Sequence, residues 1–236
     1  SFTSKLEGRK LYSGYRLIAC DGSDINIARN PKDTDTYFQS FPTDKGFNQL
    51  HLNVFYDLLN RSYTDAVIQP ARKENEFAAC VQMIDQHEFS EKVILIADRG
   101  YENYNIFAHS KSKGLNYLIR VKDKNSNGIV SGLHIQENRS FDRRVSFLLT
   151  RRQTNEIKSH PDIYKFLPNN VKFDYLPVGD KGTYPISFRV VRFPISEETY
   201  ETIVTSLDEA EFPPERIKEI YNMRWGVETS FRELKY

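Results

Sequence analysis

The sequence predicts a mixed α/β fold, and two observations carry that prediction. Residues 93–97 form a fully apolar run, which is typical of a strand that is buried on both faces of a sheet. Strand-like and helical segments alternate over residues 1–122, in the order strand, hairpin, helix, strand, helix, strand. This order indicates a mixed sheet with parallel strands at its centre and helices on its faces.

The first strands are marked by their apolar residues and by the turns between them. Residues 15–20 are largely apolar and end directly at Asp21, where we expect the strand to stop. Residues 47–56 and 63–69 are predicted to form a hairpin, because polar and apolar side chains alternate and an Asn-Arg turn separates the two segments. Pro70 closes the second of them.

Two helices and a further strand are expected next. Residues 74–86 have helical spacing of their apolar side chains and contain good helix formers. The apolar strand at 93–97 ends at Asp98. A second helix is predicted over residues 103–111, and residues 115–121 form the last strand of this part.

The chain changes character after residue 122. Strand-like runs occur at 145–150 and 186–193, prolines are frequent, and no clear helical period is present. We therefore expect a β-rich insertion over residues 123–210. The α/β core would comprise residues 1–122 and 211–236.

The C-terminal segment is predicted to be one amphipathic helix that begins at Pro213 and Pro214, because proline is tolerated in a first turn. On a helical wheel of about 100° per residue, four polar side chains share a stripe roughly 60° wide. They are Tyr221, Arg224, Glu228 and Lys235. A carboxylate between two cations suits a site for a metal ion and a polyanion, although a solvated face with salt bridges gives the same pattern.

Composition excludes several classes of protein. A hydrophobic fraction of 39% indicates a globular chain rather than a disordered one. No apolar run has the length of a membrane span, and we expect no signal peptide. Cys20 and Cys80 lie far apart in sequence, so we expect reduced, buried thiols in a cytosolic protein.

The distribution of charge is more informative than the net charge of +1. Between Lys111 and Lys158, eleven Lys and Arg stand against four Asp and Glu, with aromatic residues among them. Such a segment suits a surface that contacts phosphates, although a merely soluble basic insertion has the same composition. The candidate DNA contacts here are Arg143, Arg144, Arg151 and Arg152.

Two carboxylates, Asp21 and Asp98, directly follow apolar strands, and ligands collect at the carboxyl ends of strands in open α/β sheets. If the two strands are neighbours, a divalent cation would offset the repulsion between the carboxylates. Glu228 would supply a third carboxylate and allow two ions about 3.5–4 Å apart. A lone strand-end aspartate is more often a turn former or a helix cap, so the prediction depends on all three. Asp24 and Glu102 are secondary candidates.

Three motifs resemble the DDE transposases of bacterial insertion sequences. They are Y-R-L-I-A-C-D-G, V-I-L-I-A-D-R-G-Y and Y-x2-R-x3-E-x6-K. The last is similar in residues and spacing to the Tyr-Arg-Glu-Lys signature of the insertion-sequence family 4 type, and G-F-N-Q-L-H-L-N-V-F-Y-D-L resembles the second strand of that branch. The resemblance implies a ribonuclease-H-like fold with a β-rich insertion before the last helix.

The resemblance also implies the roles of site residues. The metal-binding and catalytic triad would be Asp21, Asp98 and Glu228. Two Mg²⁺ ions, which Mn²⁺ can replace, would be the cofactors. Phosphates of the transposon end would be held by Tyr221, Arg224 and Lys235. Relatives that cut through a DNA hairpin flip a base onto an aromatic side chain. Tyr200 is the candidate for this here, whereas Trp225 is expected to pack.

The expected function is metal-dependent phosphodiester hydrolysis at transposon ends, followed by strand transfer by the 3′-hydroxyl. The expected partners are double-stranded DNA of the terminal inverted repeats and of the target, with a homodimer in the full-length complex. The expected location is the bacterial cytoplasm, at the nucleoid. Two alternatives stay open: a nuclease of the same fold without strand transfer, and a domesticated relative that binds DNA without catalysis.

Overall fold

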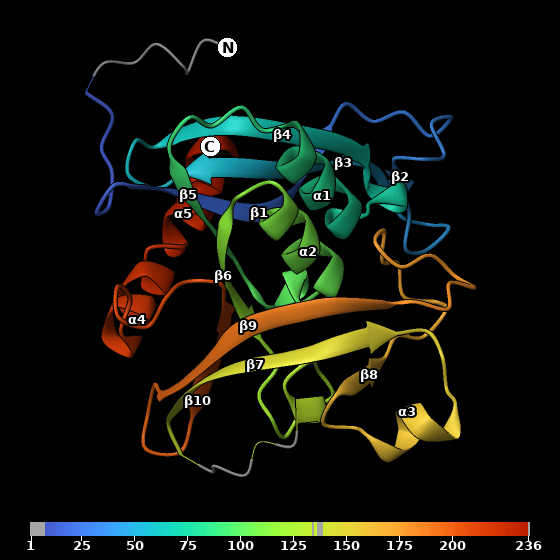
Figure 1. The fold of residues 1–236 in the computed structure, drawn as a ribbon. Helices are drawn as coiled ribbons and strands as arrows, with labels where there is room; N and C mark the ends of the chain where they lie inside the picture. The colour runs from blue at the N-terminus through green and yellow to red at the C-terminus, as the bar shows by residue number, and fades with distance from the viewer. Residues whose placement is uncertain (1–7, 134, 136–138, 236) are drawn as a thin grey trace. The chain divides into compact units, whose positions relative to one another are not determined.

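A computed structural model describes residues 8–133, 135 and 139–235 of the chain (Figure 1). Helices and strands alternate along it, and its strands pair in both parallel and antiparallel directions. The mixed α/β class predicted from the sequence is therefore confirmed. Within the described residues, no helix has the length and apolar character needed to cross a membrane.

The chain divides into two compact units. The described residues of Ser1–Ala97 and Asn222–Tyr236 form the first unit, and those of Asp98–Tyr221 form the second. This division does not follow the expected boundaries of the insertion at residues 123 and 210, which stay a prediction.

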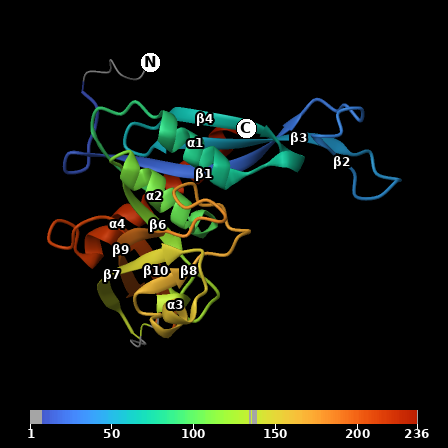
Figure 2. The same ribbon diagram turned by 45° about the vertical axis from the view of Figure 1, so that its right-hand side comes forward.

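The first unit contains a mixed sheet with the strand order β2-β3-β1-β5. Its strands are β1 (Tyr15–Ile27), β2 (Tyr37–Phe38), β3 (Phe47–Asp57), β4 (Ser62–Pro70) and β5 (Lys92–Ala97). β1 pairs with β3 antiparallel and with β5 parallel. β3 and β4 form the predicted hairpin. β2 pairs with the first residues of β3, and Figure 2 shows it beside that end of the strand.

The expectation that the first strand ends at Asp21 is wrong, because β1 continues to Ile27. The parallel ladder between β1 and β5 does end there, with Cys20 opposite Ala97. β3 is long enough to pair with the rest of β1, beginning with Val54 opposite Asp21. Asp21 therefore lies where β1 loses one of its two neighbouring strands.

Side chains of β1 and β3 alternate between the two faces of this sheet. One face packs against α5 (Trp225–Lys235) through Ala19, Val54, Val227 and Phe231, which belong to one buried apolar cluster. The other face carries side chains that reach α1. Successive side chains of β1 therefore face α5 and α1 in turn.

The other helical segments of the first unit follow β4 directly. A short 3-10 helix covers Ala71–Lys73, and α1 covers Glu76–Gln86. Asn75 begins α1 as a side-chain cap, since its side chain accepts a hydrogen bond of 3.0 Å from the backbone N–H of Ala78. The helix predicted over residues 74–86 is thus confirmed.

The second unit is built on a sheet with the order β6-β10-β9-β7-β8. Its strands are β6 (Asn116–Val121), β7 (Phe141–Thr150), β8 (Tyr164–Phe166), β9 (Thr183–Pro194) and β10 (Tyr200–Thr205). β7 and β8 are parallel, and the other neighbours are antiparallel. The strand-like runs predicted at 145–150 and 186–193 lie in β7 and β9.

The helices of this unit precede, interrupt and follow its strands. The α-helices are α2 (Tyr104–Ser112), α3 (Asn155–Ser159) and α4 (Pro214–Asn222), and the 3-10 helices are Arg99–Tyr101 and Ser131–Leu133. α2 confirms the predicted second helix. Phe107 of α2 stacks on Tyr117 of β6, with ring centres 4.9 Å apart.

The prediction of one continuous C-terminal helix is wrong. α4 ends at Asn222, and α5 begins at Trp225. In the turn between them, the N–H of Gly226 donates to the carbonyl of Met223, and the N–H of Val227 donates to that of Arg224. Both bonds span three residues rather than four, which tightens the chain into a 3-10 turn.

Gly226, the second residue of α5, lies close to another segment of the chain. Glycine is a poor helix former, and a Cβ at position 226 would lie 3.1 Å from Cδ2 of Leu58. The backbone at the start of α5 therefore approaches the β3–β4 turn closely. The single helical wheel does not describe residues 221–235, and only Glu228 and Lys235 of the predicted stripe share a helix.

Candidate active site

Asp21 and Glu228 come together in the first unit on either side of Arg224. Arg224 donates from Nη2 to Oε1 of Glu228 at 2.8 Å, and its Nη1 lies 3.7 Å from Oδ2 of Asp21. The side chain of Arg224 is only 6% exposed, against 19% for Asp21 and 32% for Glu228. A nearly buried cation thus offsets the repulsion between two carboxylates at the rim of the sheet.

Local structure explains this arrangement. Asp21 lies two residues after Ala19, so both side chains project from the α5 face of β1. Glu228 follows Val227, which packs into the apolar cluster beneath α5. The packing of α5 therefore places the carboxylate of its first turn next to β1.

Lys235 lies near the other end of the same helix. Its Nζ donates a hydrogen bond of 2.7 Å to Oγ of Ser23, which follows Asp21 by two residues on the same face of β1. Glu228 and Lys235 are seven residues apart on α5, or about 10 Å along the helix axis. Opposite charges thus lie at the two ends of a short polar strip beside β1.

Asp98 directly follows β5. Its side chain caps the 3-10 helix Arg99–Tyr101 by accepting a hydrogen bond of 2.7 Å from the N–H of Gly100. The last residue of β5, Ala97, stands opposite Cys20 in the parallel ladder. The strands that lead into Asp21 and Asp98 are therefore parallel neighbours, as the carboxylate prediction required.

The two secondary acids have other partners. Glu102 accepts hydrogen bonds from the backbone N–H groups of Lys122 and Ile129, so it holds the segment after β6. Burial raises the pKa of Glu102. Asp24 projects from the opposite face of β1 to Asp21, where its Oδ1 lies 2.8 Å from Nδ1 of His51.

His51 is a candidate functional residue that sequence reasoning missed. Oε2 of Glu74 lies 3.0 Å from its Nδ1, and Oε1 of Glu76 lies 3.1 Å from its Nε2. The hydrogen bond to Glu76 is the largest cause that raises the pKa of His51 to about 9, against the lowering effect of burial. Only the register of β1 and β3, which pairs Asp24 with His51, could have revealed the cluster.

Arg151 does not lie on a surface open to DNA. Its side chain is buried and donates to three backbone carbonyls, those of Leu176 at 2.7 Å, Pro168 at 2.8 Å and Val171 at 3.0 Å. Its guanidinium therefore holds the loop that leads to β9. Because these bonds use the donors that a phosphate would need, the structure corrects the assignment of Arg151 as a DNA contact.

The other three arginines predicted to contact DNA are exposed. Arg143 and Arg144 lie on β7, and Arg152 lies just after that strand. Arg152 donates to the carbonyl of Lys181 at 3.4 Å. These three cations stay candidates for phosphate contacts.

The predicted aromatic and phenolic contacts lie in packed surroundings. The guanidinium carbon of Arg192 lies 3.8 Å from the ring centre of Tyr200, so one face of that ring is covered. Tyr221 in α4 is 4% exposed. A stacked base on Tyr200 and a phosphate on Tyr221 stay predictions.

Trp225 was expected to pack, and this expectation is wrong. Its side chain is 59% exposed, and the guanidinium carbon of Arg224 lies 5.2 Å from its ring centre. The reason is the break in the C-terminal helix. Trp225 is the first residue of α5, whose buried side begins with Val227.

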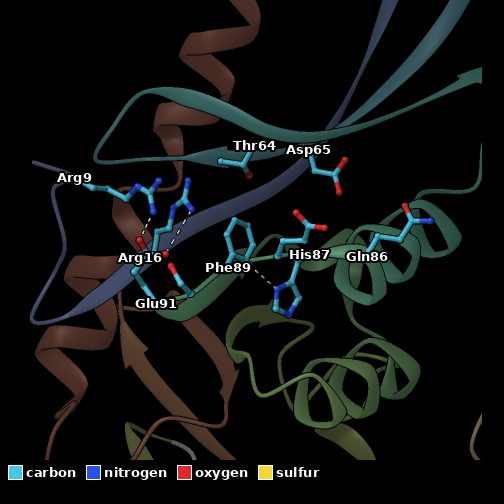
Figure 3. A pocket seen from close by; sticks show the side chains of 10 residues that line it. Arg9, Arg16, Thr64, Asp65, Gln86, His87, Phe89 and Glu91 are labelled. Atoms are coloured by element: carbon cyan, nitrogen blue, oxygen red, sulfur yellow. Dashed lines mark hydrogen bonds and ion pairs between the residues drawn. The ribbon is translucent and has the colours of Figure 1, made fainter. Parts of the chain in front are cut away.

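A pocket of about 280 Å³ lies at the amino-terminal end of β1 and β5 (Figure 3). Two arginines line it, and both are neutralised. Arg9 pairs with Glu91, and Arg16 donates to Asp57 at 2.7 Å. The guanidinium of Arg16 also lies over the ring of Phe89. The pocket therefore offers an anion no excess of positive charge.

The Arg192 cluster of the second unit gives a prediction for acid stability. Arg192 and Thr202 both donate to Asp123, and the bond from Arg192 is the main cause that lowers the pKa of Asp123 from 3.8 to about 2. A lowered carboxyl pKa contributes stability above the unfolded-state value, and this contribution is lost as the pH falls through 3.8 towards 2. Asp123→Asn should therefore remove up to about 2 kcal/mol of pH-dependent stability in this window.

Urea unfolding followed by circular dichroism at several pH values between about 5 and 2 measures this effect. We expect the free energy of unfolding of Asp123→Asn to fall less steeply with acid than that of the wild type. The exposed Glu198→Gln is the matched control and should follow the wild-type curve. An equally steep acid dependence in Asp123→Asn would contradict the prediction.

Comparison with known protein families supports a functional reading of this geometry. A family model described as "Transposase DDE domain" matches residues 12–236. The chain belongs to this family. DDE transposases cleave and transfer DNA in general and use divalent metal ions, which agrees with carboxylates gathered where the parallel pairing of β1 with β5 ends.

Solved structures show which fold the DDE domain adopts here. A cryo-EM structure of piggyBac transposase in a synaptic complex with hairpin DNA is similar, with a TM-score of 0.52 and 11% sequence identity. The match covers 91% of this chain and 39% of that chain, so this DDE domain spans well under half of the piggyBac protein. The likeness confirms the ribonuclease-H-like fold. None of the curated proteins matches the sequence.

Proposed function

We propose that this DDE domain is the catalytic core of an insertion-sequence transposase of the family 4 type. It hydrolyses a phosphodiester at the end of the element, and the freed 3′-hydroxyl then attacks another DNA strand. The observation that carries the proposal is the ion-paired group of Asp21, Arg224 and Glu228 beside β1. Asp98 follows the parallel neighbour of that strand.

The donor set fits hard divalent cations. Asp21, Asp98 and Glu228 offer carboxylate oxygens only, which suit Mg²⁺ and also Mn²⁺. We propose that these three residues hold two Mg²⁺ ions, which Mn²⁺ can replace. At these residues the ions would lower the pKa of the attacking water or hydroxyl and would stabilise the leaving oxygen.

Arg224 and Lys235 are proposed to bind phosphates of the transposon end. Arg224 contacts both Asp21 and Glu228. Cations bound by those carboxylates would free its planar fork for bidentate contact with a phosphate. Lys235 would add a point charge at the other end of α5, and Tyr221 a phenolic hydrogen bond.

The proposed partners are double-stranded DNA of the terminal inverted repeats and of the target. The similar piggyBac structure, a synaptic complex with hairpin DNA, supports this proposal. Arg143, Arg144 and Arg152 are the exposed cations that would contact the DNA backbone outside the catalytic group. We also propose a homodimer in the full-length complex, located in the bacterial cytoplasm at the nucleoid.

A joining assay tests the function. End-labelled duplexes that carry the inverted repeats flanking the gene are incubated with the protein, Mg²⁺ and an unlabelled plasmid. We expect cleavage at the 3′ end of the element and transfer of label to the plasmid. Both products should require a divalent ion.

The other outcomes separate the alternatives. A labelled end that is cleaved but never transferred would overturn the transposase proposal in favour of a nuclease of the same fold. Binding of the duplex without cleavage under any divalent ion would favour a non-catalytic relative that binds DNA.

A further inference from the structure

We propose that Asp24, His51 and Glu74 form a second metal site, which binds one divalent transition-metal ion of the zinc class. Glu76 is the positioning residue for the imidazole. This site is separate from the proposed carboxylate triad, and it does not depend on the proposed function.

The three ligand groups converge from different segments of the first unit. Asp24 belongs to β1, His51 stands opposite it in β3, and Glu74 precedes α1. One ligand atom from each lies within 4.8 Å of the other two. Oδ1 of Asp24 and Oε2 of Glu74 lie 2.8 and 3.0 Å from the same imidazole nitrogen, Nδ1 of His51.

The two distances from the carboxylate oxygens to Nδ1 are close to the distances between ligand atoms in a zinc site. With metal–ligand bonds of about 2.0–2.1 Å, tetrahedral ligands stand about 3.3 Å apart. The two carboxylate oxygens therefore need to withdraw from Nδ1 by only a few tenths of an ångström. The side chains of Asp24 and Glu74 are 46% and 48% exposed, so they are free to make this adjustment.

The second imidazole nitrogen already has the partner that such sites use. Metal-bound histidines donate their other ring N–H to a carboxylate or carbonyl, which fixes the tautomer and the ring orientation. Nε2 of His51 lies 3.1 Å from Oε1 of Glu76 in the first turn of α1. With Nε2–H donating to Glu76, a metal ion would take the place of the proton through which Nδ1 contacts Asp24 and Glu74.

Gly22 is a second, independent feature that keeps the imidazole in this position. A Cβ at residue 22 would lie 2.5 Å from both Nε2 of His51 and Oε1 of Glu76. Glycine therefore leaves the room in which the ring and its positioning carboxylate lie against β1. Any side chain here would displace the histidine from Asp24 and Glu74.

The donor set selects the class of metal. An imidazole nitrogen with two carboxylates suits Zn²⁺ and neighbouring first-row ions, whereas Mg²⁺ favours oxygen ligands alone. The His51 side chain is 8% exposed, so the nitrogen ligand is held by the fold rather than by a mobile surface side chain. Three protein ligands leave the fourth tetrahedral position to water.

The alternation of β1 separates this site from the proposed triad. Asp21 and Ser23 face α5, whereas Gly22 and Asp24 face α1. A bound ion would link β1, β3 and the start of α1. It would lie on the face of β1 opposite to Asp21. We therefore expect it to stabilise the first unit.

Titration of the purified, chelator-treated protein with Zn²⁺ alone tests the proposal. Isothermal calorimetry gives the number of sites, and X-ray absorption at the zinc edge shows whether nitrogen is bound. We expect one Zn²⁺ site with a nitrogen ligand that persists in Glu228→Gln. His51→Gln should remove it, and Glu74→Gln should weaken it by at least about tenfold. Glu76→Gln should weaken it by about 10–100-fold.

Controls keep the proposal open to refutation. Glu88→Gln changes an exposed acid elsewhere in the first unit and should bind Zn²⁺ as the wild type does. If His51→Gln does not fold, as circular dichroism would show, the exposed Glu74→Gln still decides. Unchanged Zn²⁺ affinity in Glu74→Gln and Glu76→Gln, or zinc bound by oxygen alone, would overturn the proposal and leave an ion-pair cluster only.

Discussion

Glu228→Gln is expected to abolish DNA cleavage while the fold is retained. The amide keeps the size of the side chain and can still accept from Arg224, but it lacks the charge that a divalent cation requires. Metal ions contribute several kcal/mol to the stabilisation of a phosphoryl-transfer transition state, so we expect a loss of about 10³-fold or more in the cleavage rate. Single-turnover cleavage of a labelled transposon end measures it.

Glu233→Gln is the matched control for this prediction, since it alters an exposed carboxylate on the same helix. It should cleave at the wild-type rate. Circular dichroism should show both variants folded. Cleavage by Glu228→Gln at a rate within about tenfold of the wild type would remove Glu228 from the metal-binding group.

Arg224→Met should lower the free energy of unfolding of the first unit when no divalent ion is added. It should also allow divalent ions to stabilise this unit at lower concentrations. Methionine fills a similar volume but leaves Asp21 and Glu228 without the guanidinium that lies between them. Because both carboxylates are partly exposed, we expect a loss of about 1–3 kcal/mol rather than the larger cost of a fully buried pair. Divalent ions would then no longer compete with a resident cation.

Urea unfolding with and without Mn²⁺ measures both effects. At about 100 times its dissociation constant, an ion that binds only the folded state adds about 2.7 kcal/mol. We expect Arg224→Met to reach this increment at a lower Mn²⁺ concentration than the wild type and to bind DNA more weakly. Arg232→Met, on the exposed side of α5, should behave as the wild type. The same Mn²⁺ dependence in Arg224→Met and the wild type would show that Arg224 does not compete with the ion.

Much of the fold could be predicted because its elements are marked by local patterns. The continuous apolar run before Asp98 and the alternating side chains of the β3–β4 hairpin decide the type of these elements with little help from tertiary contacts. The continuation of β1 past Asp21 could not be predicted in this way. It depends on the length of β3, which supplies pairing partners as far as Ile27.

The C-terminal helix shows where local patterns are insufficient. The spacing of its polar residues predicted one continuous helix with these residues on a common face. The chain instead turns between Asn222 and Trp225. The close approach of Leu58 to Gly226 is a contact between segments distant in sequence. Glu228 and Lys235 keep their common face, while Tyr221 belongs to another helix and is buried.

The candidate site was predicted in its residue types but not in its contacts. The sequence by itself determined that carboxylates follow two apolar runs and that a carboxylate and two cations recur near the C-terminus, because apolar runs and helical spacing are local properties. Only the tertiary structure decided that Arg224 lies between Asp21 and Glu228, that Arg151 is buried in its own loop, and that His51 meets three acids. Each of these depends on strand register or loop packing, which brings together side chains that no sequence spacing relates.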